Sequence, residues 1–298
     1  MESVTLRQVG EVIIVFGRAT ARIEKSGPRF GSSADVKALN EVYDYVYKLQ
    51  PPKWPEDVLG AIDRDRAKLG EAVYSREGCA RCHPLAPYPT IQAKPAGRQL
   101  IKVTATPLAE IGTDPHYAEY FVRRTATPGS LAPLLDGTPF KNQPTVPAAV
   151  LFLAALTKIT EADLDRAART PAERATLLGD RPLPTLPKTP AEVDELLKNV
   201  QVYKATPLAG IWATAPYLHN GSVPTLYDLL LPEAKRPKEF HVGDREFDPV
   251  KVGYRTTPFP GSYRFDTTLP GYSNRGHTYG AGLGDDDRHA LVEFLKTL

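Results

Sequence analysis

The chain has 298 residues, of which 42% are hydrophobic, and its formal net charge is +2. This length allows one large domain or two smaller ones, and the composition is that of a globular protein with a sizeable core. The small charge gives no basis for binding nucleic acid or an anionic membrane surface, and we expect neither partner. We also expect no membrane span, because no apolar segment is long enough.

The 29 prolines predict short helices joined by ordered, turn-rich loops. Residues 1–32 have the pattern of a mixed strand-and-loop lead-in, with a strand-like run at Val12–Phe16. Ser33 is a candidate cap for a helix that ends before Pro51 and has apolar positions at helical spacing, namely Val36, Leu39, Val42, Val46 and Leu49. A second helix is expected after Pro55, with an apolar face formed by Val58, Leu59, Ile62, Leu69 and Val73.

Later helices are predicted from their first residues. Asp114-Pro115 places a cap before a first-turn proline, and Thr170 and Thr189 each begin a capping box with proline at the first helical position. Pro147–Leu156 has the length of a buried helix. Alternating apolar residues around Gly243-Asp244 predict a small β-hairpin, and three aspartates from Asp285 begin a final helix.

The only two cysteines of the chain lie in the sequence Cys79-Ala80-Arg81-Cys82-His83. C-x-x-C-H is the attachment pattern of a c-type haem, because two thiols on one helical turn reach both vinyl groups of one porphyrin. His83 then supplies the proximal imidazole. A zinc site would need a second pair of ligands, and a thioredoxin-like dithiol would open a helix after a strand, whereas a helical pattern precedes this motif. We therefore predict one covalent haem c.

Two further segments carry a family resemblance. The helix that leads into C-x-x-C-H and the final helix resemble the two ends of a class I cytochrome c domain, and Ile211–Leu226 resembles the T-A-P-Y-x-H-x-G segment of bacterial dihaem cytochrome c peroxidases. With Pro52–Asp57, Ile111–Pro115 and Gly276–Gly280, the chain from about residue 40 looks like the C-terminal haem half of dihaem proteins that include the latex-cleaving rubber oxygenases. This resemblance implies a mainly α fold, a cytochrome c-like haem domain with a long loop-rich insertion and a small β-hairpin.

The resemblance also implies a domain plan and a function. We expect residues 1–32 to be a lead-in left from an upstream domain and residues 33–298 to be the haem domain, with an insertion at about 90–270. Family members carry two C-x-x-C-H motifs and this chain has one, which corresponds to the electron-transfer half. The expected function is electron transfer to a redox partner protein or a second haem domain. The alternative is a haem enzyme that activates peroxide or oxygen.

The iron needs a sixth ligand or an open face, and a sixth ligand would come from histidine because Met1 is the only methionine. His277 lies between two glycines in a loop, and it matches the distal histidine of the related haem. A glycine-flanked loop lets the backbone approach a porphyrin closely. His219 is the second candidate, although the matching peroxidase residue implies a propionate or backbone hydrogen bond. The remaining histidines, His116, His241 and His289, have no distinguishing context.

The sequence offers weaker candidates for contacts to the haem, to calcium and to the haem propionates. Trp212 could lie against the haem or on an electron path, but a core position is the better interpretation of a tryptophan. Thr214 and Pro216 match peroxidase positions whose carbonyls hold calcium between two haem domains, and we do not expect that site in a chain with one haem motif. Cations that could neutralise haem propionates are Arg245, Lys251, Arg255 and Arg275.

Haem c is attached outside the cytoplasm, so we expect a periplasmic or secreted protein. The first residues, Met1 to Thr5, lack the basic and apolar regions of an export signal. We therefore expect the signal to lie upstream of a fragment.

Overall fold

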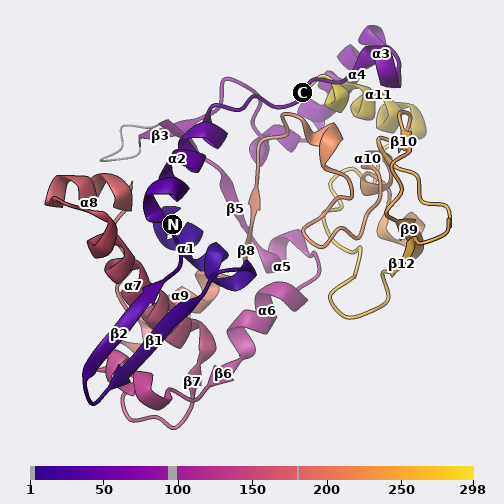
Figure 1. Cartoon of the computed structure of the whole chain (residues 1–298). Coiled ribbons are helices and arrows are strands. Elements are labelled where there is room, and N and C mark those ends of the chain that lie inside the picture. Colours follow the sequence, from indigo (N-terminus) through magenta and orange to yellow (C-terminus); the bar gives the residue numbers. More distant parts are fainter. Residues whose placement is uncertain (1–3, 93–98, 180) are drawn as a thin grey trace. The chain divides into compact units, whose positions relative to one another are not determined.

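The computed structural model describes residues 4–92, 99–179 and 181–298. It divides the chain into two compact units (Figure 1). Unit 1 consists of Met1–Leu49, Thr90–Lys102 and Ala118–Gln201. Unit 2 consists of Gln50–Pro89, Val103–Tyr117 and Val202–Leu298. These boundaries differ from the predicted one at residue 33, and the extent of the haem domain stays a prediction.

Unit 1 is built mainly from helices. They are α1 (Val4–Val15), α2 (Val36–Tyr47), α7 (Ala148–Ala167), α8 (Pro171–Leu178), α9 (Pro190–Asn199) and the 3-10 helix η2 (Gly129–Leu135). Its strands form antiparallel pairs, β1 (Ala19–Glu24) with β2 (Gly27–Ser32), β3 (Thr90–Gln92) with β4 (Gln99–Ile101), and β6 (Thr125–Ala126) with β7 (Val146–Pro147). Helix α6 (His116–Arg123) begins in unit 2 and continues into unit 1.

The main core of unit 1 forms around α7. Leu6 and Val9 of α1 are fully buried and belong to the same apolar cluster as Leu153 and Leu164 of α7. The predicted strand at Val12–Phe16 is therefore wrong, because this apolar run continues a helix whose inner face packs in that cluster. The buried helix predicted from Pro147 is confirmed and extends to Ala167.

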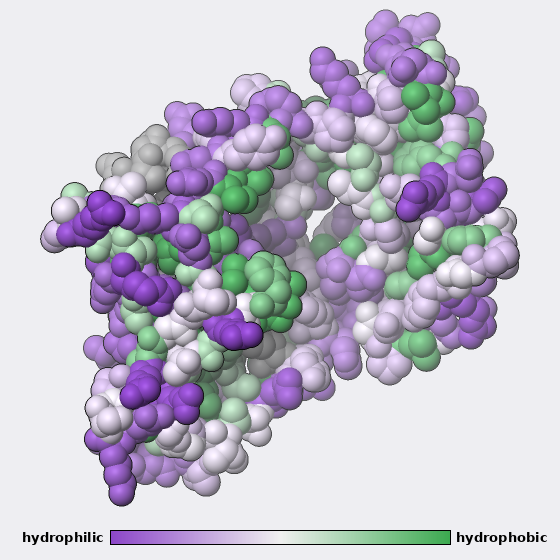
Figure 2. Space-filling model, viewed as in Figure 1, coloured by the Kyte–Doolittle hydropathy of each residue, from purple (hydrophilic) through white to green (hydrophobic). Residues whose placement is uncertain are grey.

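Unit 1 leaves apolar side chains at its surface (Figure 2). At the end of α1, Phe16 is 80% exposed, and on α2 the side chains of Val42 and Val46 are 58% and 52% exposed. The predicted apolar face of α2 is thus buried only at its beginning, at Val36. The predicted cap is also corrected. Asp35 accepts hydrogen bonds from the first turn of α2, while the hydroxyl of Ser33 accepts one from the backbone of Arg18.

Unit 2 combines short helices with short strand pairs. Its helices are α3 (Glu56–Leu59), α4 (Arg64–Arg76), η1 (Cys79–Arg81), α5 (Leu108–Ile111), η3 (Ile211–Thr214), α10 (Leu226–Leu229), η4 (Glu233–Lys235) and α11 (Asp285–Lys296). Its antiparallel pairs are β5 (Thr104–Pro107) with β8 (Val202–Ala205), β9 (Glu239–Val242) with β12 (Tyr263–Asp266), and β10 (Phe247–Asp248) with β11 (Gly253–Tyr254).

Two sequence predictions for unit 2 need correction. The helix expected after Pro55 is two helices, because Gly60 adopts φ 91° and interrupts it. Two residues of its predicted apolar face, Val58 and Leu69, are 75% and 65% exposed. The hairpin expected around Gly243 does not form, since β9 on one side pairs with β12 and β10 on the other pairs with β11. Of the residues that the structure describes, 43% are helical and 15% lie in strands, so the fold is mixed and the prediction of a mainly α protein is only partly correct.

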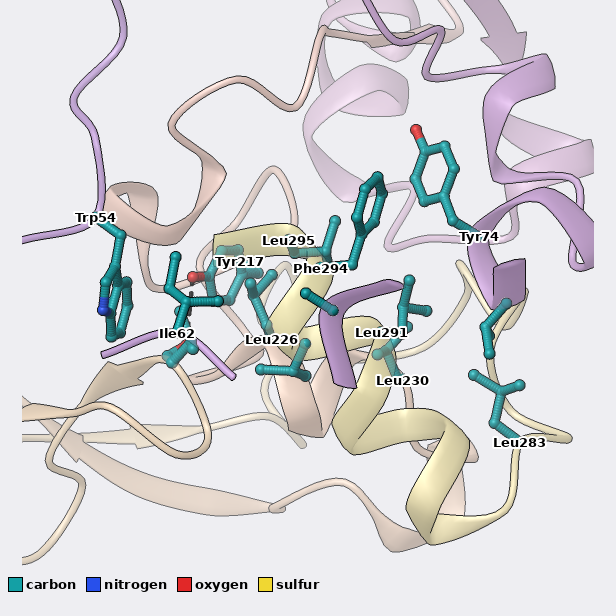
Figure 3. Packing of buried hydrophobic residues seen from close by; sticks show 14 of the residues in the cluster. Trp54, Ile62, Tyr74, Tyr217, Leu226, Leu230, Leu283, Leu291, Phe294 and Leu295 are labelled. Carbon is teal, nitrogen blue, oxygen red and sulfur yellow. Dashed lines mark hydrogen bonds between the residues drawn. The ribbon is translucent and has the colours of Figure 1, made fainter. Parts of the chain in front are cut away.

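The core of unit 2 is centred on α11. Leu291, Phe294 and Leu295 of this helix pack with Tyr74 of α4 and with Leu226 of α10 (Figure 3). Helices α4 and α11 come close at Gly70, where a Cβ would lie 1.9 Å from the carbonyl oxygen of Ala290. Only glycine permits this approach. The crossing of a helix before C-x-x-C-H with the final helix is the arrangement that the cytochrome c resemblance implies.

Candidate haem site

The C-x-x-C-H segment follows directly after α4. Gly78 adopts φ 71°, which ends the helix, and η1 then turns the chain back. The carbonyl of Cys79 accepts hydrogen bonds from the backbone N–H of Cys82 at 3.2 Å and of His83 at 2.9 Å. This single turn brings both thiols and the imidazole to the wall of one cavity. Burial raises the pKa of the Cys79 thiol, which is the opposite of the activated thiolate in a redox dithiol.

His83 is oriented by the backbone. Its Nδ1 lies 2.7 Å from the carbonyl oxygen of Thr206, so Nδ1–H donates to that oxygen. Its own carbonyl accepts a hydrogen bond from the hydroxyl of Tyr74. A histidine held at one ring nitrogen by a carbonyl presents the other nitrogen to a metal in a fixed orientation. His83 therefore has the second contact that a metal-binding imidazole needs.

His277 lies on the loop between β12 and α11. It adopts φ 48°, and its N–H donates to the carbonyl of Ile111 at 2.9 Å. The preceding Gly276 has φ 77° and lies so close to α5 that a Cβ would be 2.3 Å from the carbonyl carbon of Gly112 and the nitrogen of Thr113. The position of the loop is thus fixed by backbone packing.

The two histidines face one cavity from different elements. Their ring centroids are 6.3 Å apart, and the ring planes are tilted by 59°. Two imidazole nitrogens that each bond a metal at about 2.0–2.1 Å are about 4 Å apart, and each centroid lies about 1 Å farther out. The observed separation matches two imidazoles on opposite sides of one metal ion. The cavity has a volume of about 240 Å³, and both cysteines line it.

The chemistry of these side chains fits a c-type haem. The Nδ1 atom of His277 is buried and has no hydrogen-bond partner in the described part of the chain. Burial, with the nearby His83 and Arg236, lowers the pKa of His277 to about 4, so the imidazole is neutral at neutral pH. Neutral imidazole is the form that binds metals. Among the described residues, no cluster of three or more His, Cys, Asp or Glu side chains provides a purely protein-bound metal site.

The structure does not bring His219 or Trp212 into the cavity wall. The ring of His219 stacks on Tyr203 at 4.2 Å. The indole of Trp212 packs on Trp54 with centroids 5.4 Å apart and donates to the carbonyl of Pro52 at 2.9 Å. The hydroxyl of Thr214 donates to the carbonyl of Ile211.

None of the four cations named for haem propionates is among the described residues that line the cavity. Arg255 pairs with Asp244 at 2.6 Å, and the ammonium of Lys251 lies 5.6 Å from the ring centre of Tyr227. Arg81 lines the cavity instead. Its place within the C-x-x-C-H segment was a signal that could have identified it.

Among the cavity residues that were not predicted, three more besides Arg81 have titratable side chains. Glu77, Glu110 and Tyr279 line the wall, and the ring of Tyr279 meets that of His277 edge-on, with centroids 5.1 Å apart. Glu77 and Tyr279 are each two residues from a predicted site residue in the sequence. Glu110 lies on α5, and only the folded chain brings this helix to the cavity.

Part of the chain matches a known protein family. Residues 202–241 match the model of a family described as RoxA-like, cytochrome c-like. The chain carries a cytochrome c-like domain. This domain supports binding of haem c and iron, and relates the chain to the rubber oxygenases named in the sequence analysis.

Two relatives from Sinorhizobium fredii match most of the chain. The "Uncharacterized protein y4iJ" is 34% identical over 324 residues, which cover 98% of this chain and 50% of that protein. The "Uncharacterized protein y4iM" is 32% identical over 293 residues, which cover 95% of this chain and 54% of that protein. The chain thus spans about half the length of these relatives. Within the described residues, no helix is long and apolar enough to cross a membrane.

Proposed function

We propose that unit 2 binds one haem c covalently and transfers electrons. The observation that carries this proposal is the 6.3 Å separation of the His83 and His277 rings across a cavity that Cys79 and Cys82 also line. Cys79 and Cys82 would form the thioether bonds, and the two imidazoles would occupy the axial positions. Every lining residue of the cavity belongs to unit 2, which is therefore the haem unit of the proposal.

Bound haem would supply a one-electron ferric–ferrous couple, and the protein would set its ligation, exposure and potential. The ring of His83 is held by the carbonyl of Thr206, and the backbone of His277 is held by the carbonyl of Ile111. An iron held by both His83 and His277 would offer no position to a substrate oxygen. Electron exchange needs only a haem edge close to a redox partner protein or a second haem domain.

A second candidate function is peroxide or oxygen activation. Glu77, Glu110 and Tyr279 line the same cavity and could move protons beside a reacting oxygen. This chemistry would require His277 to leave the iron, against the backbone contacts that hold its loop. Electron transfer is therefore the preferred function. Because haem attachment takes place outside the cytoplasm, we also propose a periplasmic or secreted location.

The proposal is tested by mass spectrometry on the full chain, expressed with periplasmic haem-attachment machinery. The intact mass after denaturing acid extraction should include one haem. The double variant Cys79→Ala, Cys82→Ala should lose that mass and its colour on the same extraction. A wild-type chain that extracts as unmodified protein would contradict covalent attachment.

A further inference from the structure

Arg236 is a buried cation that follows η4. Its residue is 2% exposed, and no carboxylate forms an ion pair with it among the described side chains. Burying a charge is costly unless hydrogen bonds compensate. Here the compensation comes from backbone carbonyls. The guanidinium donates to the carbonyls of Leu229, Leu231, Asn274, Gly276 and His277.

Three of these carbonyls belong to the loop that carries the candidate distal ligand. The distances from the guanidinium nitrogens are 2.6 Å to Asn274, 2.8 Å to Gly276 and 3.0 Å to His277. Arg236 thus binds both residues of the turn at Gly276 and His277. A planar guanidinium with several donors in a fixed arrangement holds such a turn more rigidly than a single ammonium could.

Glu233 of η4 reinforces this contact. Its Oε1 accepts a hydrogen bond from the N–H of Gly276 at 2.6 Å. The backbone N–H of Gly276 therefore donates to Glu233, and its carbonyl accepts from Arg236. One short segment of the chain holds both groups. On the other side, the loop rests on Gly112 of the α5 end.

A purely structural role is the alternative, and Arg288 illustrates it. This arginine is 6% exposed and donates to the carbonyls of Leu230 and Leu283, and among the described residues no hydrogen bond joins it to residues 274–277. Arg236 differs because its partners include the candidate ligand itself.

We propose that Arg236 is the positioning residue for His277 and that its buried charge raises the reduction potential of the bound iron. The inference rests on the proposed haem function. Arginine keeps its charge at neutral pH. A nearby positive charge disfavours the ferric state, which carries one more positive charge than the ferrous state. Glu233 and Asp228 partly offset that charge, since both interact electrostatically with Arg236.

The experiment compares Arg236→Met, Arg236→Lys and Glu233→Gln in the full haem-loaded chain, with Arg288→Met as the matched control. Spin state is read from the ferric optical spectrum, and potential from a redox titration. Arg236→Met should gain high-spin iron, which added imidazole returns to low spin. In its low-spin fraction the midpoint potential should fall by about 59 mV, equal to a tenfold shift in the ferric–ferrous equilibrium.

The other variants separate position from charge. Arg236→Lys keeps the charge but not the planar arrangement, so it should gain high-spin iron while the potential of its low-spin fraction stays near the wild-type value. Glu233→Gln keeps an acceptor for Gly276 and removes a negative charge, so it should stay low-spin and shift the potential upward. Arg288→Met should lower thermal stability and leave the spin state and potential of the folded protein unchanged.

Three results would overturn the inference. The first is an Arg236→Met variant that keeps the wild-type spectrum and potential. The second is an Arg288→Met control whose spectrum and potential change as much as those of Arg236→Met. The third applies if Arg236→Met does not fold, and it is an Arg236→Lys variant without high-spin iron. A wild-type chain without covalent, low-spin haem would instead contradict the proposed function. The two failures are therefore distinguishable.

Discussion

Backbone carbonyls hold the ring of one candidate iron ligand and the main chain of the other. The ring of His83 donates to the carbonyl of Thr206, and the main-chain N–H of His277 donates to that of Ile111. The ligands thus come from segments almost two hundred positions apart, and each contacts a further distant segment. Their 6.3 Å separation depends on the folded chain rather than on any local motif.

The first residue-scale prediction concerns His277→Ala. Removing this imidazole should open one axial position and convert the ferric haem from low spin to high spin, since no other histidine lies in the described cavity wall on that side. Added imidazole should restore the low-spin optical spectrum. His219→Ala serves as the control, because its ring stacks on Tyr203 outside that wall. A His219→Ala variant that turns high-spin while His277→Ala does not would reverse the assignment.

Some residues of this site could be predicted from the sequence and others could not. Cys79, Cys82 and His83 follow from spacing alone, because their chemistry is local. His277 was a candidate through its flanking glycines and its family match. Glu110 and Arg236 could not be found in this way, because only tertiary structure brings α5 and η4 to the His277 loop.

At the scale of elements, the contact between α4 and α11 supports the C-x-x-C-H turn. Tyr74 of α4 packs on Phe294 of α11 with ring centroids 5.3 Å apart, and its hydroxyl donates to the carbonyl of His83. The helix pair is therefore linked directly to the candidate proximal ligand. A change that separates these helices should affect the haem environment as well as stability.

Gly70→Ala tests that contact. The new Cβ would lie 1.9 Å from the carbonyl oxygen of Ala290, so backbone must move, and overpacking of this kind costs about 1–3 kcal/mol. We expect a lower free energy of unfolding in a denaturant titration of the haem-loaded chain. Gly282→Ala is the control, because no heavy atom lies within 4 Å of its added Cβ. Equal stability of the two variants would show that the helices do not depend on this close approach.

Helix beginnings were easier to predict than strand partners. The side chains of Thr170 and Thr189 cap α8 and α9 as expected, because a capping box acts within four residues. The register of β9 could not be predicted, since Phe240 lies opposite Phe265 of a distant strand. The misread run at Val12–Phe16 has a related cause. Its helical character depends on packing in the α7 cluster, which the local sequence does not reveal.

At the scale of the whole molecule, the chain passes several times between its two units. Unit 2 is assembled from three segments, and all three contribute to the cavity wall through Cys79, Glu110 and His277. The sequence predicted a cytochrome c-like region with a long insertion, but it could not show which parts of that insertion belong to unit 2. Residues 103–117 and the part from residue 202 onward do so.

Whole-chain activity provides the next prediction. The purified, haem-loaded chain should be reduced by dithionite and by a small cytochrome or artificial donor, yet show little turnover with peroxide or polyisoprene. If His83 and His277 both hold the iron, oxygen would find no vacancy, and dissociating one imidazole first would add to the barrier. His277→Ala provides the comparison, because opening the iron should raise peroxide turnover. Efficient peroxide turnover by the wild-type chain would favour the enzyme alternative.

Electron paramagnetic resonance of the ferric, haem-loaded wild-type chain tests most directly whether His83 and His277 bind one iron from opposite sides. The 6.3 Å separation of their rings predicts a low-spin signal with two axial nitrogen ligands. This signal should be replaced by a high-spin one in His277→Ala. A high-spin ferric signal in the wild-type chain, or a low-spin signal that persists unchanged without the His277 imidazole, would contradict the account.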